Sequence, residues 1–138
     1  MAEKLFEKAI AESSIKKRIQ VFSAGISAME GDQASENSIE VCGEIGLDLT
    51  DHRSSALTRA IIENASVIFC MTESHRALLH MYFELPEGSP IFLMREFMEI
   101  ETKELADPYG QSIETYRICR DDMRAALPTL IKWVEKNL

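Results

Sequence analysis

Residues 67–72 read Val67-Ile68-Phe69-Cys70-Met71-Thr72, a continuous apolar run that ends at a threonine. An apolar run without alternation is typical of a parallel strand that is covered on both faces. Threonine is favoured at the N-cap of a helix, so we expect a helix to begin directly after this strand. A buried strand that leads straight into a helix predicts an α/β fold.

The same alternation of helices and strands extends in both directions. Helices are expected where apolar residues recur at three- and four-residue steps, and strands where short apolar runs lie between turn residues. In the helix after Thr72, we expect Leu78, Met81 and Tyr82 to face the core. The expected helices cover 1–10, 34–45, 56–64, the stretch after Thr72, and 113–134, and the expected strands cover 19–22, 67–71 and 91–93.

Strands that alternate with helices imply right-handed crossovers and hence a three-layer α/β/α architecture around a parallel sheet. The length of 138 residues fits a single domain over 1–138. In such sheets ligands bind beyond the carboxyl ends of the strands. We therefore expect the functional residues in the loops after Phe22, Met71 and Leu93.

Charge and cysteine content narrow the class of protein. The 15 Lys and Arg against 23 Asp and Glu give a net charge of -8, which argues against nucleic acid or an anionic membrane as partner. Cys42, Cys70 and Cys119 are odd in number and widely spaced, as expected of reduced thiols packed in the core of a cytoplasmic protein. No apolar run approaches the 18 or so residues of a membrane span.

Metal and hydrolase motifs are absent from the sequence. The three histidines, His52, His75 and His80, form no i, i+4 pair, and there is no Cys-x-x-Cys, so we expect no metal site and no cofactor. A Gly-x-Ser-x-Gly motif, which marks one large class of serine hydrolases, does not occur either.

Residues 70–76 spell Cys-x5-Arg between a predicted strand and a predicted helix, where a thiolate and a phosphate-binding arginine would be placed. A phosphate loop usually needs glycine to turn its N–H groups inward. This segment contains none, and Glu73 would repel a phosphate. We favour a buried Cys70 followed by a capped helix over a catalytic Cys70 with Arg76.

A second candidate, Asp107-Pro108-Tyr109-Gly110, precedes the last helix. Pro108 restricts Asp107 to extended backbone, which can hold its carboxyl group over a site as a general acid. Tyr109 could form the wall of a pocket for a planar group. The same four residues also fit an ordinary turn that starts a helix, and spacing alone favours the turn.

The order of the motifs resembles the low-molecular-weight protein tyrosine phosphatase family over nearly the whole chain. The matching motifs are Met1-Ala2-Glu3, Ser23-Ala24-Gly25, His52-Arg53-Ser54, 69–74 and 107–110. The resemblance implies a parallel sheet in the order 2-1-3-4. It also implies that the first, central strand and the Cys-x5-Arg-Ser-Pro phosphate loop lie upstream of Met1, so we expect an N-terminally truncated domain.

The resemblance assigns roles to three residues. Asp107 matches the acid that protonates the leaving group and then activates water against a phosphocysteine. Tyr109 matches the aromatic wall of the substrate cleft, and His52 a residue that supports the phosphate loop from behind. The implied substrates are phosphotyrosine or phosphoarginine in proteins, or a small aryl phosphate, if the loop is restored.

Without that loop we expect no turnover by this chain as it is printed. The alternative is a natural non-catalytic relative that binds a partner, and arsenate reduction on the same scaffold also needs the loop cysteine. Removal of a central strand leaves a gap of about 10 Å, twice the strand spacing. We therefore expect residues 19–22 to close onto 67–71, or another chain, as in a homodimer, to fill the gap.

Overall fold

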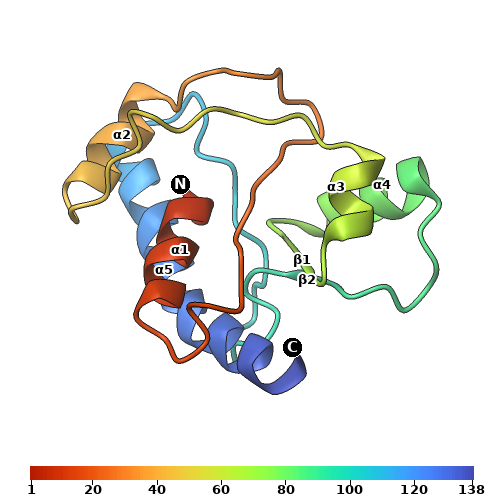
Figure 1. Ribbon diagram of the computed structural model, residues 1–138. Helices are drawn as coiled ribbons and strands as arrows, with labels where there is room; N and C mark the ends of the chain where they lie inside the picture. Colours follow the sequence, from red (N-terminus) through yellow and green to blue (C-terminus); the bar gives the residue numbers. More distant parts are fainter.

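The computed structural model describes residues 1–138. Seven elements follow one another along the chain (Figure 1). They are α1 (Ala2–Ala11), α2 (Glu36–Gly43), α3 (Arg59–Asn64), β1 (Ile68–Cys70), α4 (Glu73–Phe83), β2 (Ile91–Leu93) and α5 (Ile113–Asn137). The fold is α/β, as predicted from the sequence.

Four of the helices begin at hydroxyl residues that cap them. In each case the side-chain oxygen accepts a hydrogen bond from the N–H three residues later, which stabilises the helix by about 1 kcal/mol. The capping residues are Ser35, Thr58, Thr72 and Ser112. The N-cap predicted at Thr72 is confirmed.

The sheet consists of β1 and β2, which run parallel with Phe69 opposite Phe92. Phe69 faces α1 and α5, where its ring centroid lies 6.1 Å from that of Phe6 and 6.2 Å from that of Trp133. Cys70 faces the other way and packs with Leu79 of α4. The strands therefore separate two layers of helices, as expected for a three-layer arrangement.

Each layer has its own apolar cluster. The larger one joins α1 and α5, and the smaller one joins α3, α4 and the strands. Figure 1 shows α1, α2 and α5 on one side of the molecule and α3 and α4 on the other. All three cysteines are buried, as predicted.

Two structural predictions are wrong. Residues 19–22 form no strand and do not close onto β1, and the nearest pairing is an isolated bridge between Gly25 and Ala56. A strand needs a neighbouring ladder, which this apolar run lacks. In α4 the core position is Leu79, whereas Met81 and Tyr82 are exposed, because the helix presents the face of Leu79 to the strands.

Candidate functional site

The loop that carries Asp107 returns to the carboxyl end of β1. The N–H of Leu105 donates to the carbonyl of Met71, one residue beyond the strand, at 2.9 Å. Leu105 itself is buried in the larger cluster. This anchor places Asp107 two residues further on, at the edge of the sheet where α/β proteins bind ligands.

The segment from Asp107 to Gly110 is a tight turn. The Oδ1 atom of Asp107 accepts a hydrogen bond from the N–H of Tyr109 at 3.0 Å, and the N–H of Gln111 donates to the carbonyl of Pro108 at 2.9 Å. Gly110 has φ 76°, a conformation that favours glycine. The turn exposes the carboxyl group of Asp107 and leaves Tyr109 79% exposed beside it.

Cys119 of α5 contacts the chain just before this turn. Its thiol donates to the carbonyl of Ala106 at 3.9 Å. Burial raises the pKa of Cys119, the carboxylates of Asp122 and Asp107 raise it further, and the amino group of Met1 lowers it. The contact with Ala106 holds the chain directly before Asp107 against α5.

The first turn of α1 organises a second set of polar residues. Oε1 of Glu3 accepts hydrogen bonds from the backbone N–H of Ser23 at 2.8 Å and from its hydroxyl at 2.9 Å. Oε2 of Glu3 lies 3.3 Å from Nδ1 of His52. One carboxylate thus connects α1 with the loop at Ser23 and the loop at His52.

A small hollow of about 220 Å³ opens beside His52. Its walls are small or polar, and they are formed by Ser23, Ala24, Gly25, Ala28, His52, Ser54 and Ser55. A Cβ atom on Gly25 would lie 2.6 Å from that of Ala28, so only glycine fits there without movement.

The structure therefore places the three predicted site residues around the start of α1 and the carboxyl edge of the sheet. His52 is tied to α1 by Glu3, whereas Asp107 and Tyr109 belong to a separate turn, and no hydrogen bond joins His52 to either of them. Sequence reasoning missed the part played by Glu3. The position of Glu3 in the first turn of a helix is a local signal, but its contact with Ser23, 20 residues later, cannot be predicted from the sequence.

The Cys-x5-Arg segment does not form a phosphate loop. Cys70 is buried, and burial raises its pKa to about 11. Arg76 pairs with Glu73 and Glu96 and donates to the carbonyl of Ile91 at 3.3 Å. The interpretation of Cys70 as a core residue followed by a capped helix is confirmed.

Comparison with known proteins decides the family. A family model described as low molecular weight phosphotyrosine protein phosphatase matches residues 1–138. The chain belongs to this family. None of the helices in the structure has both the length and the apolar character required to cross a membrane.

Members of the family with different named activities are similar to this chain. A protein-arginine-phosphatase of Bacillus subtilis is 31% identical over 137 residues, which are 99% of this chain and 89% of that protein. A probable low molecular weight protein-tyrosine-phosphatase, EpsP, of Ralstonia nicotianae is 29% identical over 98 residues, 71% of this chain and 65% of that protein.

Solved structures of the family share the fold. The low molecular weight protein tyrosine phosphatase of T. tengcongensis superposes with a TM-score of 0.84 and 30% identity, over 95% of this chain and 87% of that one. The α/β architecture is therefore that of the low-molecular-weight phosphatases.

Proposed function

We propose that this protein acts in the hydrolysis of phosphorylated side chains of proteins, with Asp107 as the general acid. The observation that carries the proposal is the exposed carboxyl group of Asp107 on a turn anchored by Leu105 to the carboxyl end of β1. Relatives named protein-arginine-phosphatase and protein-tyrosine-phosphatase support phosphoarginine and phosphotyrosine as the substrates.

The chemistry proceeds in two steps on a cysteine thiolate. The thiolate takes the phosphoryl group, and Asp107 gives its proton to the leaving phenol oxygen or guanidine nitrogen. The Asp107 carboxylate then accepts a proton from the water that hydrolyses the phosphocysteine. The ring of Tyr109 forms a wall beside the substrate, and His52, held by Glu3, steadies the phosphate-binding side of the site.

We infer that none of the three cysteines in residues 1–138 is the nucleophile. A cysteine attacks phosphorus as its thiolate, and burial raises the pKa of all three thiols, Cys42, Cys70 and Cys119. At a pKa of about 11, roughly one Cys70 thiol in 10⁴ is ionised at pH 7. We therefore propose that the 138-residue chain alone does not turn over, and that a Cys-x5-Arg loop must be supplied to it.

The experiment compares the printed chain with a chain extended ahead of Met1 by a strand and a Cys-x5-Arg-Ser-Pro loop. Both are assayed with an aryl phosphate and with phosphoarginine. We expect hydrolysis only by the extended chain, lost when the added cysteine becomes serine. Turnover by the printed chain that is abolished by Cys70→Ser would contradict the proposal.

Asp107→Asn in the extended chain tests the acid. Loss of a general acid lowers kcat by about 10²–10⁴-fold, and the loss shrinks as the leaving group improves. Asp32→Asn, also at an exposed aspartate in a loop, is the matched control and should leave kcat unchanged. Equal effects of the two substitutions, or a loss that is independent of the leaving group, would exclude Asp107 as the acid.

The burial of all three thiols also fits a second function, a phosphatase-like protein that binds a phosphorylated partner without turnover. Titration of the 138-residue chain with a phosphotyrosine peptide distinguishes the two. Binding that is lost on Asp107→Ala and absent with the unphosphorylated peptide would favour the binding function.

A further inference from the structure

The loop that carries Asp107 contains neither a helix nor a strand. It joins β2, which ends at Leu93, to α5, which begins at Ile113. A connection of this length without regular structure is uncommon in a compact domain, and to fix its backbone costs conformational entropy at every residue. Residues 95–107 also carry five carboxylates against two cations, Arg95 and Lys103, so repulsion within the loop favours an open form. The shape of the loop therefore depends on contacts that offset both costs.

The first part of the loop is attached to the core. The ring of Phe97 stacks on that of Trp133 in α5, with the ring centroids 5.9 Å apart. Oε2 of the preceding residue, Glu96, accepts a hydrogen bond from the N–H of Leu93 at 3.1 Å. Oε1 of Glu96 lies 3.4 Å from Nη1 of Arg76 in α4. Residues 96 and 97 thus form a fixed support for the rest of the loop.

Lys103 connects the second part of the loop to this support. Its partly buried ammonium group donates a hydrogen bond to the carbonyl of Glu96 at 3.1 Å and another to the carbonyl of Met98. The carbonyl of Glu96 has no other donor. Hydrogen bonds from a charged donor are roughly twice as strong as neutral ones. One positive charge thereby closes the loop on itself in the middle of its carboxylates.

The closed loop leads directly to Asp107. Nη1 of Arg95 donates to the carbonyl of Glu104, the residue after Lys103, at 3.1 Å. The next residue, Leu105, is the one whose N–H reaches the carboxyl end of β1. Without the contacts of Lys103, the single bonds from Arg95 and Leu105 would have to hold this charged segment. The position of the Asp107 turn therefore depends on the closure made by Lys103.

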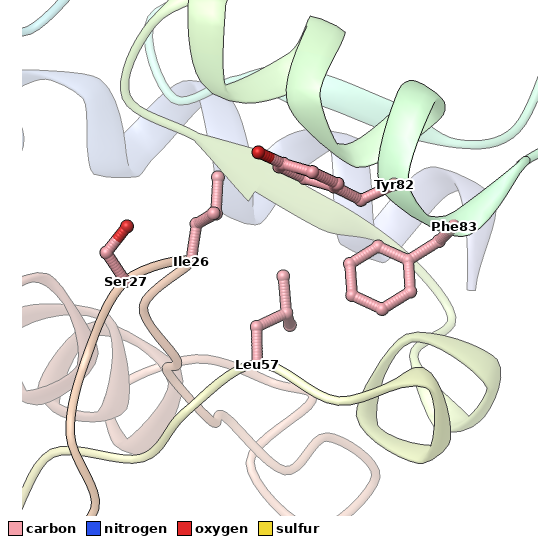
Figure 2. A pocket seen from close by; sticks show the side chains of 5 residues that line it. All are labelled: Ile26, Ser27, Leu57, Tyr82 and Phe83. Atoms are coloured by element: carbon pink, nitrogen blue, oxygen red, sulfur yellow. The ribbon is translucent and has the colours of Figure 1, made fainter.

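The loop lines neither the hollow beside His52 nor a second hollow against α4. The second hollow has a volume of about 350 Å³, and Figure 2 shows its lining, which is formed by Ile26, Ser27, Leu57, Tyr82 and Phe83. A group bound in either hollow would not contact the side chains of the loop. The order of the loop therefore comes from its own contacts.

We propose that Lys103 is a positioning residue, whose ammonium group holds the loop closed so that the carboxyl group of Asp107 faces the leaving group of the substrate. This role rests on the proposed function of Asp107 as the general acid. Lys103 transfers no proton and contacts no substrate, because it acts through Leu105 and the turn that follows. Its removal should therefore slow only the step that needs the acid.

The first test uses the 138-residue chain. Lys103→Met keeps most of the apolar stem and removes the donors. Hydrogen exchange followed by NMR should show that the amides of Leu105 and Tyr109 exchange about tenfold faster or more, whereas the amide of Leu130, which is fully buried in α5, keeps its rate and shows that the variant folds. Lys16→Met is the matched control, because Lys16 is an exposed lysine in a turn, and it should change none of these rates.

Kinetics of the extended chain, which carries the added Cys-x5-Arg loop, separate a positioning role from a general loss of structure. Lys103→Met should lower kcat about tenfold for phenyl phosphate and leave KM unchanged. It should hardly affect nitrophenyl phosphate, whose leaving group needs little proton donation. In a chain that already carries Asp107→Asn, Lys103→Met should have no further effect, because residues that act through one another are not additive.

Four outcomes would overturn the proposal. Unchanged exchange at Leu105 would show that Lys103 does not hold the loop. An equal loss of kcat for both leaving groups, or a further loss on top of Asp107→Asn, would make Lys103 a structural residue only. If Asp107→Asn itself leaves kcat unchanged, the proposed function fails and the role of Lys103 fails with it. A large effect of Asp107→Asn together with no effect of Lys103→Met rejects the role of Lys103 alone.

Discussion

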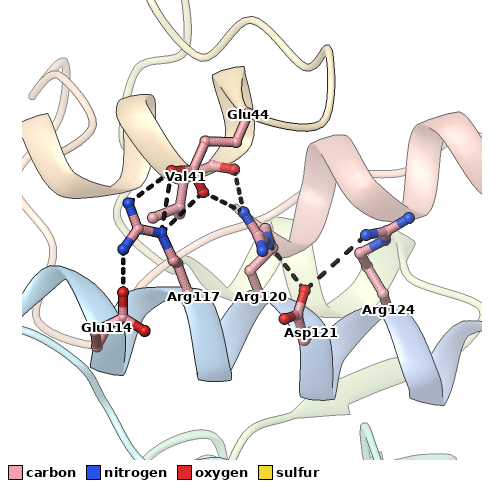
Figure 3. A network of polar contacts seen from close by, with 7 residues as sticks. All are labelled: Val41, Glu44, Glu114, Arg117, Arg120, Asp121 and Arg124. Carbon is pink, nitrogen blue, oxygen red and sulfur yellow. Dashed lines mark hydrogen bonds and ion pairs between the residues drawn. The ribbon is translucent and has the colours of Figure 1, made fainter.

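Replacement of Arg120 by methionine tests how α5 holds α2 (Figure 3). Arg120 is 8% exposed, and its Nη1 donates to the carbonyl of Val41 at 2.8 Å and to Oε1 of Glu44 at 2.7 Å. Carbonyls in the last turn of a helix lack helical partners. The N–H of Ile45, which would bond to Val41 in a longer helix, bonds to Cys42 at 3.1 Å. Arg120 is thus the partner of a buried carbonyl.

The magnitude follows from what methionine removes. It keeps most of the apolar stem but has no donor, so a charged hydrogen bond of about 1.5–3 kcal/mol is lost and the carbonyl of Val41 stays buried without a partner. We expect the free energy of unfolding to fall by about 2–4 kcal/mol. Arg124→Met is the control, because Arg124 is half exposed and its contact with Asp121 is 4.0 Å long. Such a pair contributes about 0–1 kcal/mol.

The assay is urea denaturation at pH 7, followed by circular dichroism, for the original chain and both variants. The dependence on urea should keep its slope, while the midpoint falls for Arg120→Met and hardly moves for Arg124→Met. If the free energies of unfolding of the two variants differ by less than about 0.5 kcal/mol, the buried guanidinium of Arg120 does not stabilise the packing of α2 on α5, and the reasoning is refuted.

Three further predictions concern acid stability, packing and thiol reactivity. Hydrogen bonds from arginines of α5 lower the pKa of Glu44 to about 2. The stabilisation that Glu44 contributes is therefore complete above pH 4.5 and is lost as the pH falls toward 2. In denaturation curves measured at a series of pH values, Glu44→Gln should reduce the loss of stability between pH 4.5 and 2. Gly25→Ala places a Cβ 2.6 Å from that of Ala28 and should lower the free energy of unfolding by about 1–3 kcal/mol, as measured by thermal denaturation. Gly43→Ala is the control, because a Cβ at Gly43 meets nothing within 4 Å, and it should not destabilise the protein. Burial raises the pKa of Cys70 to about 11, so iodoacetamide should label this thiol at pH 7 at least 10²-fold more slowly in the folded protein than in urea. Peptide mass mapping measures the two rates, and equal rates would contradict the burial of Cys70.

The helices were predictable from the sequence because their signals are local. A hydroxyl residue that precedes a helical repeat of apolar residues, as at Thr72 or Ser112, indicates the start of a helix. This signal lies within four consecutive residues. The strand at 91–93 was predicted for the same reason, since three apolar residues directly follow Pro90. In the structure Ile91 and Leu93 belong to the smaller cluster.

Residues 19–22 were predicted as a strand because their composition is that of a strand, yet a strand is defined by its neighbour. Their burial does alternate, with Ile19 and Val21 inward and Phe22 outward. Without a ladder beside them, the hydrogen bonds that would complete the strand are missing. Composition therefore predicts the side-chain pattern of such a segment but not its pairing.

The candidate site shows the same division between local and long-range information. The turn at Asp107 is encoded by four adjacent residues, and both its Asp–Pro geometry and its exposure follow from them. The position of this carboxyl group depends on the hydrogen bond between Leu105 and Met71, 34 residues earlier in the chain, and no spacing rule predicts that contact. The link from Glu3 to His52 is equally remote. Because each half of the site is assembled by one such contact, substitution at Leu105 or Glu3 should displace Asp107 or His52 without altering either residue.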